Sequence, residues 1–153
     1  MRTDRTVSTI HFMSPTLEYA KITDARIAIS DIYDTVSRHL VVGIARENDA
    51  PVTVIRKDDL KSVLLSHCAL EPKVHFSKAG QVSIWLENLP VSSQGNSLIE
   101  AEIELIESLR AYTQTWIEEL REYPNHHKGW ALPALVQLSD DNELRQFLFG
   151  NEE

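Results

Sequence analysis

The feature that most constrains this chain is a change in the spacing of its apolar residues, from a period of two to a helical period. Residues 74–76 and 82–86 alternate apolar with polar side chains, which is typical of half-buried strands. Ala79-Gly80 lies between them and predicts a tight hairpin. Residues 91–94 form a third short extended segment that leads to a turn at Gly95. The pattern predicts a small group of strands that runs directly into a helix.

The longest helix of the protein is expected to follow this turn. Ser97 and Glu100 have the spacing of a capping box, which starts a helix. Pro124 disfavours helical geometry at the residue before it, so the helix should end by Tyr123. One apolar stripe should face the core, formed by Ile99, Ile103, Ile106, Leu109, Thr113, Trp116 and Leu120. The glutamates that should mostly face away are Glu100, Glu104, Glu107, Glu118 and Glu122.

The start of the chain follows a different pattern. Residues 1–20 indicate an irregular arm, which Ser14-Pro15 interrupts. From Asp24 the apolar residues repeat at three and four positions, and Thr23 or Asp24 can cap the first turn of a helix. The expected apolar stripe of this helix is Ile29, Ile32, Val36 and Leu40.

A second hairpin and a short helix are expected next. The apolar runs 40–45 and 52–55 are rich in β-branched residues and flank a polar connection that contains a proline, which favours a hairpin. Asp58-Asp59 then places acidic side chains at the positive end of a short helix through Leu64 or Leu65.

The predicted fold class is α+β, with three regions along the chain. Residues 1–70 should form a helix–hairpin–helix unit, and residues 71–125 a β-hairpin with the long helix. Residues 126–153 should form a C-terminal tail with a short helix that Ser139, Asp140 and Asp141 cap.

Charge and composition restrict the function classes. The net charge is −8. Residues 1–65 hold 9 Lys/Arg and 9 Asp/Glu, whereas residues 66–153 hold 6 and 14. An acidic half repels phosphates and suits a basic protein partner, although it also keeps a protein soluble. With a single cysteine, no apolar run that could span a bilayer and no apolar leader, a cytoplasmic location without membrane contact is expected.

No motif for catalysis or cofactor binding is present. The five glycines are scattered and form no phosphate-binding loop. Cys68 follows His67, but sequence neighbours point in different directions and do not form a nucleophile–base pair. His67, Cys68 and His75 lack the second ligand pair that a structural zinc site needs. The sequence therefore predicts a binding protein, with no enzyme activity, cofactor or metal.

Residues 20–65 resemble the Phd/YefM (prevent-host-death) antitoxins. The family pattern is a short strand, a helix with an alanine–arginine start, two apolar strands around a tight turn, and an acidic helix start. At the hairpin tip, Glu47-Asn48-Asp49 replaces the family's arginine–glycine turn. The matching segments are Ile22–Arg26, Ser30–Ile32, Val42–Arg46, Pro51–Ile55 and Asp59-Leu60.

Residues 73–120 resemble HicB-like antitoxins, whose units run strand, strand, a leucine–proline segment with a glycine turn, and a helix. Here Leu89-Pro90 is followed by Gly95, the capping residue Ser97 and Glu100-Ala101, with the spacing of that family. Both resemblances imply an antitoxin of a bacterial type II toxin–antitoxin system.

The resemblance also implies partners for the first region: operator DNA and a second copy of the chain. The residues expected to contact DNA are Arg2, Arg5, Lys21 and Arg26, with ordinary surface charge as the alternative. An isolated two-stranded hairpin is marginally stable, so a homodimer is also expected on physical grounds. Its interface should include Val42, Ile44, Val52 and Val54.

The tail carries much apolar surface for a chain end. It either docks on the long helix or binds a basic toxin, and the second interpretation is slightly favoured. The expected toxin-binding residues are Trp130, Leu132, Leu135, Leu144, Phe147 and Phe149. Two alternatives to an antitoxin remain open: a non-enzymatic oligomeric structural or adaptor protein without DNA binding, and an enzyme whose catalytic centre is shared between subunits.

Overall fold

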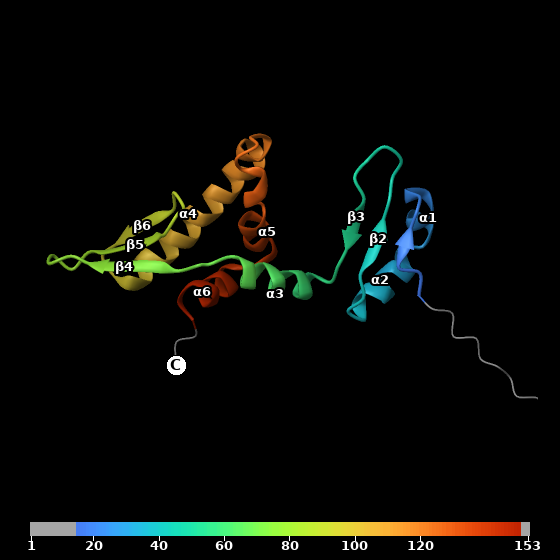
Figure 1. The fold of residues 1–153 in the computed structure, drawn as a ribbon. Helices are drawn as coiled ribbons and strands as arrows, with labels where there is room; N and C mark the ends of the chain where they lie inside the picture. Colours follow the sequence, from blue (N-terminus) through green and yellow to red (C-terminus); the bar gives the residue numbers. More distant parts are fainter. Residues whose placement is uncertain (1–14, 151–153) are drawn as a thin grey trace, which may run out of the picture. The chain divides into compact units, whose positions relative to one another are not determined.

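The computed structural model describes residues 15–150 and divides the chain into two compact units, residues 1–56 (unit 1) and 57–153 (unit 2). Figure 1 colours their elements along the chain from blue to red. The expected boundary near residue 70 is displaced because Leu64 packs in one cluster with Ala131 and Leu135. The helix that carries Leu64 therefore belongs to unit 2.

Unit 1 consists of a three-stranded sheet and two short helices. Its elements are β1 (Glu18–Tyr19), α1 (Ile22–Ile27), α2 (Ile29–Ser37), β2 (Val42–Ile44) and β3 (Val52–Val54). The strand order is β1-β2-β3, with β1 parallel to β2. Strands β2 and β3 form the expected antiparallel hairpin. Strand β1 lies in the segment that was expected to be irregular; bonds from Gly43 N to Leu17 O (2.8 Å) and from Ala45 N to Tyr19 O (2.9 Å) hold it.

The helix expected from Asp24 is two helices. It begins two residues earlier, after Lys21, which makes no side-chain cap bond, so the expected caps at Thr23 and Asp24 are wrong. Ala28 leaves helical geometry with φ −95° and ψ 20°. This break changes the phase of the stripe, and Ile29 points to solvent. The core of unit 1 is Ala25, Ile32, Val36 and Val42.

Unit 2 contains an antiparallel sheet, four α-helices and two 3₁₀ turns among its described residues. They are α3 (Lys57–His67), β4 (Pro72–Phe76), β5 (Val82–Leu86), β6 (Ser92–Gly95), α4 (Leu98–Glu118), η1 (Leu120–Glu122), η2 (His127–Gly129), α5 (Ala131–Leu138) and α6 (Asp141–Phe149). The strand order is β4-β5-β6, and the expected tight hairpin joins β4 to β5.

The start of α4 follows the sequence prediction, but its buried face does not. Ser97 accepts a bond from Glu100 N at 3.2 Å, while the Glu100 carboxylate accepts from Asn96 N at 2.8 Å, one residue before the N-cap. The residues that face the core are Ala101, Glu102, Leu105, Ile106, Leu109 and Thr113. Ile99 and Ile103 are exposed, because α4 packs against β5 and β6 through a face turned away from them.

Gly95 is the residue that allows β6 to pass into α4. A Cβ atom there would lie 2.6 Å from the backbone nitrogen of Ala101 and 3.0 Å from the carbonyl oxygen of Ser97. Backbone atoms of a helix cannot shift to make room, so the turn requires glycine. The Ser93 hydroxyl donates to Ala101 O at 2.6 Å and fixes the strand to the helix.

The C-terminal region is part of the core of unit 2. The stretch Trp130–Leu138 forms α5, and α6 begins at Asp140 with a complete capping box to Glu143, as expected from its sequence. Both helices pack against α4. Arg145 of α6 forms an ion pair with the buried Glu102 at 2.8 Å, and Arg110 of α4 donates to Ser139 O at 3.0 Å.

Candidate functional site

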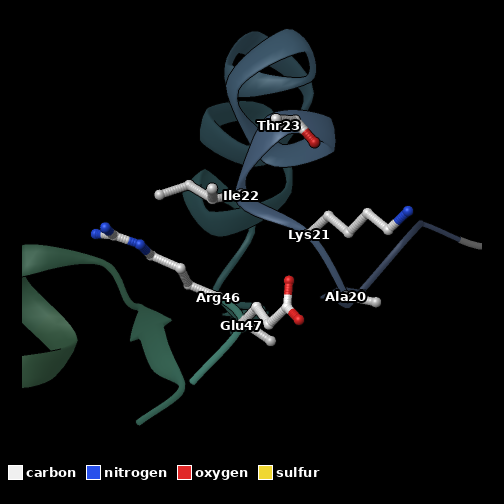
Figure 2. Close-up of a pocket in the computed structure, with 7 residues that line it drawn as sticks. Ala20, Lys21, Ile22, Thr23, Arg46 and Glu47 are labelled. Atoms are coloured by element: carbon white, nitrogen blue, oxygen red, sulfur yellow. The ribbon is translucent and has the colours of Figure 1, made fainter. Parts of the chain in front are cut away.

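A shallow pocket of unit 1 lies between the start of α1 and the segment after β2. Figure 2 shows its lining residues: Lys21, Ile22 and Thr23 come from the α1 side, and Arg46 and Glu47 from the β2 side. The Lys21 and Arg46 side chains extend in opposite directions (Figure 2). Two cations so arranged do not converge on one small anion. They suit separate contacts along an extended polyanion.

Basic side chains at this pocket include one predicted DNA contact and one new candidate. Lys21 is exposed at the start of α1, and Arg26 is exposed in its last turn. Neither forms an ion pair with another residue in the part of the chain that the structure describes. Arg46 was not predicted, although it ends the strand of the Phd/YefM resemblance; it pairs with Asp49 at 3.1 Å. Arg2 and Arg5 lie outside the described residues.

Unit 1 as a whole is neutral. Residues 1–56 hold seven Lys/Arg and seven Asp/Glu. Arg38 donates to Asp34 O at 3.3 Å, and Arg56 donates to Ser37 O at 3.4 Å, so both are engaged within the unit. Among the described residues, local attraction for a polyanion would come from Lys21, Arg26 and Arg46.

The predicted dimer residues differ in accessibility. Val42 is completely buried in unit 1 and cannot contact a second chain, which corrects that prediction. Ile44 and Val54 are partly buried, and Val52 is exposed on the edge strand β3. The sequence patterns missed a second apolar surface on the helices, where Ile27 is 86% exposed. Its other members are Ile29 and Tyr33, which are i,i+4 neighbours on α2.

The predicted toxin-binding residues are not a continuous surface. Leu135 and Leu144 are fully buried in the clusters of unit 2, so they are not available to a partner. This corrects two residues of the prediction: the helices fold back, as the alternative interpretation of the tail required. Leu132, Phe147 and Phe149 pack partly buried against the core, and Trp130 remains half exposed.

Unit 2 carries the whole excess of negative charge. Residues 57–153 hold eight Lys/Arg and 16 Asp/Glu. Glu100, Glu104 and Glu107 lie exposed on α4. Glu143 accepts a hydrogen bond from Lys61, and this bond, with that from Asp140 N, holds the pKa of its carboxyl below its usual range.

No arrangement for catalysis is found in the described residues. Burial raises the pKa of the Cys68 thiol, which stays protonated at neutral pH and is a poor nucleophile. Within residues 15–150, no three His, Cys, Asp or Glu side chains gather as metal ligands. No described helix has the length and apolar character needed to cross a membrane.

Comparisons with known proteins agree on one class. The PHD-like family model, described as antitoxin of toxin–antitoxin, RelE/RelB, TA system, matches residues 13–148. A crystal structure from Syntrophomonas wolfei subsp. wolfei, described as the antitoxin part of a proposed toxin/antitoxin system, is similar with a TM-score of 0.68 and 20% identity. The similarity covers 86% of this chain and 94% of that one, and at this identity it shows a common fold. No curated protein matches the chain.

Proposed function

Since the chain belongs to the PHD-like family of antitoxins of RelE/RelB toxin–antitoxin systems, we propose that it neutralises a cognate toxin through unit 2 and represses its own operon through unit 1. It acts by binding and not by catalysis. The observation that carries this division of labour is that all of the net charge of −8 belongs to unit 2, while unit 1 is neutral.

Charge supports unit 2 as the toxin-binding part. Toxins that act on nucleic acids need basic surfaces, and an acidic unit attracts such a partner and speeds its association. The exposed carboxylates of Glu100, Glu104 and Glu107 project from α4. The same charge would keep unit 2 away from DNA phosphates.

Three observations support unit 1 as the part that contacts the operator. Lys21, Arg26 and Arg46 are exposed and lie on or beside α1. The order strand, helix, helix, strand, strand resembles the Phd/YefM pattern, which has one helix where this unit has α1 and α2. The exposed apolar residues Ile27, Tyr33 and Val52 would be covered in a homodimer. A dimer doubles the phosphate contacts, which compensates for the neutral charge of each unit.

Neutralisation is tested by expressing the protein encoded beside this chain's gene, alone and with the full-length chain. The neighbouring protein alone should arrest growth, and the chain should restore it. Glu104→Lys with Glu107→Lys should weaken the rescue. The matched control is Asp31→Lys with Asp34→Lys, a pair of exposed acids at the same i,i+3 spacing on α2. Equal rescue by both double variants would contradict the assignment to unit 2.

The neutral charge of unit 1 favours one second candidate: a toxin-binding oligomer that does not bind DNA. In that case unit 1 only dimerises. The two candidates differ in whether the full chain binds the DNA upstream of its gene at low salt, where electrostatic contacts are strongest.

A further inference from the structure

Strand β4 is an open edge of the sheet in unit 2 (Figure 1). Ser77 donates its backbone N–H to Gln81 O at 2.8 Å, and the register continues with His75 opposite Ser83. Because bonding directions alternate along an antiparallel strand, the N–H and C=O groups of Val74 and Phe76 point outward. Across residues 15–150, no backbone group bonds to these outward groups. The edge can therefore accept another strand.

The same two residues carry apolar side chains that α4 leaves uncovered. Val74 pairs with Ile84 and Phe76 with Val82, so all four share the face of the sheet on which α4 packs. The helix covers β5 and β6, and Phe76 remains 62% exposed and Val74 41% exposed. The apolar face of β4 is therefore largely exposed, which corrects the expectation of a half-buried strand here. On this face of the sheet, α4 covers β5 and β6 and leaves the apolar side chains of β4 uncovered.

The start of α4 lies at the same end of the sheet as Phe76, and it exposes both apolar and acidic side chains. Phe76, Val82 and Gly95 form one row across the sheet, and α4 begins three residues after Gly95. Its first turns expose Ile99 and Ile103, together with the carboxylates of Glu100 and Glu104. A strand added to β4 would place alternate side chains beside Val74 and Phe76. Basic residues of that strand could reach the carboxylates.

We infer that β4 receives an extended basic segment of the toxin as a fourth strand, with backbone bonds to Val74 and Phe76 and apolar contacts to their side chains. The inference rests on the proposed function. Charge identifies the occupant: a second copy would bring another unit of net charge −8, which repels, whereas a basic segment is attracted.

Backbone hydrogen exchange tests this directly. The full-length chain is measured by NMR with and without the protein encoded beside its gene. The amides of Val74 and Phe76 should become protected in the complex, while that of His75, already bonded within the sheet, should change little. The double variant Val74→Ser, Phe76→Ser should bind the neighbouring protein at least tenfold more weakly, the size of loss typical of a central interface contact. Trp85→Ser is the matched control, since Trp85 is also 41% exposed but lies on the opposite face.

The outcomes distinguish a failure of the inference about β4 from a failure of the proposed function. Binding without protection of Val74 and Phe76, or equal weakening by Trp85→Ser, overturns the inference and leaves the proposed function intact. Absence of binding to the neighbouring protein overturns the proposed function and the inference with it. Protection that appears without that protein and rises with the concentration of the chain identifies a second copy as the occupant, and this also overturns the inference.

Discussion

Unit 1 and unit 2 differ in how completely each buries its own apolar side chains. Among the described residues, four buried hydrophobic residues lie in unit 1 and 14 in unit 2. Unit 1 still exposes Ile27, Ile29 and Tyr33 on its helices, whereas the C-terminal helices of unit 2 close its core. A short segment buries a smaller fraction of its surface on folding than a long one does. We therefore propose that unit 1, with its small core, is stabilised by a second chain and that unit 2 folds without one.

The two units also differ in net charge. Unit 1 is neutral, whereas unit 2 holds an excess of eight acidic residues. Apolar surface favours contact with an identical neutral copy, and acidic surface favours contact with a different, basic protein. Four predictions test this comparison.

The largest effect is expected for Gly95→Val in unit 2. The new Cβ would collide with backbone atoms of Ala101 and Ser97, and we expect unit 2 to lose about 4 kcal/mol or more of stability. All three tryptophans, Trp85, Trp116 and Trp130, lie in unit 2, so their fluorescence during urea unfolding reports that unit.

The control for this variant is Gly80→Ala. Gly80 has φ +85° but open space around it, so the substitution should cost only about 1–2 kcal/mol of backbone strain. NMR signals of Ile32 and Val36 in unit 1 should be unchanged in Gly95→Val. If they are lost together with the tryptophan signal, the two units do not fold independently.

The next effect concerns the C-terminal helices. Leu144→Ala should lower the free energy of unfolding of unit 2 by about 2–5 kcal/mol, because it leaves a cavity in a closed core. Trp130→Ala, at a half-exposed position, should cost less than about 1 kcal/mol. A Leu144→Ala protein that unfolds like the wild type but no longer rescues cells would instead make the tail a docking surface.

The contrast between the start of α4 and its buried face shows which parts of the fold the sequence determines locally. Gly95, Ser97 and the alternation of β5 act within a few residues, and the predicted hairpin, turn and helix start are confirmed. The buried face of α4 depends on a distant residue: Glu102 is buried because Arg145, 43 positions later, neutralises it. A local pattern reads Glu102 as solvent-facing and Ile99 as core, and so assigns the wrong face.

The candidate site was predictable to a similar degree. Arg26 is expected from the family resemblance, and Lys21 is expected as an added electrostatic contact of the arm. Both stay predictions, and the structure places both side chains at the surface. Arg46 is missed because its position opposite Lys21 depends on the pairing of β1 with β2. A strand of two residues leaves no recognisable pattern in the sequence. The open edge of β4 could not be predicted either, because the alternation of apolar and polar residues does not show which strand a helix leaves uncovered.

An intermediate effect is expected for DNA binding by unit 1. Lys21→Ala, Arg26→Ala and Arg46→Ala should each weaken binding to the upstream operator by about 1 kcal/mol and lower the salt slope by about one, as for loss of one phosphate contact. Arg38→Ala is the control, because Arg38 is bonded to Asp34 O within α2. Fluorescence anisotropy at several salt concentrations measures both quantities. An equal loss in all four variants would indicate general electrostatics without a defined contact surface.

The smallest effect concerns Lys61 and Glu143, which join α3 to α6 within unit 2. The hydrogen bond from Lys61 holds the pKa of the Glu143 carboxyl below its ordinary value of 4.5 in the folded protein. The resulting stabilisation is therefore fully present above that ordinary pKa and is lost as the pH falls through the lower, folded value. Lys61→Met should reduce the urea midpoint slightly at pH 7, and the reduction should be smaller near pH 3, because protonation of Glu143 at low pH removes its attraction for Lys61. If the difference between Lys61→Met and the wild type is the same at both pH values, the contribution of Lys61 comes from its hydrocarbon chain, which packs largely buried, and not from its charge.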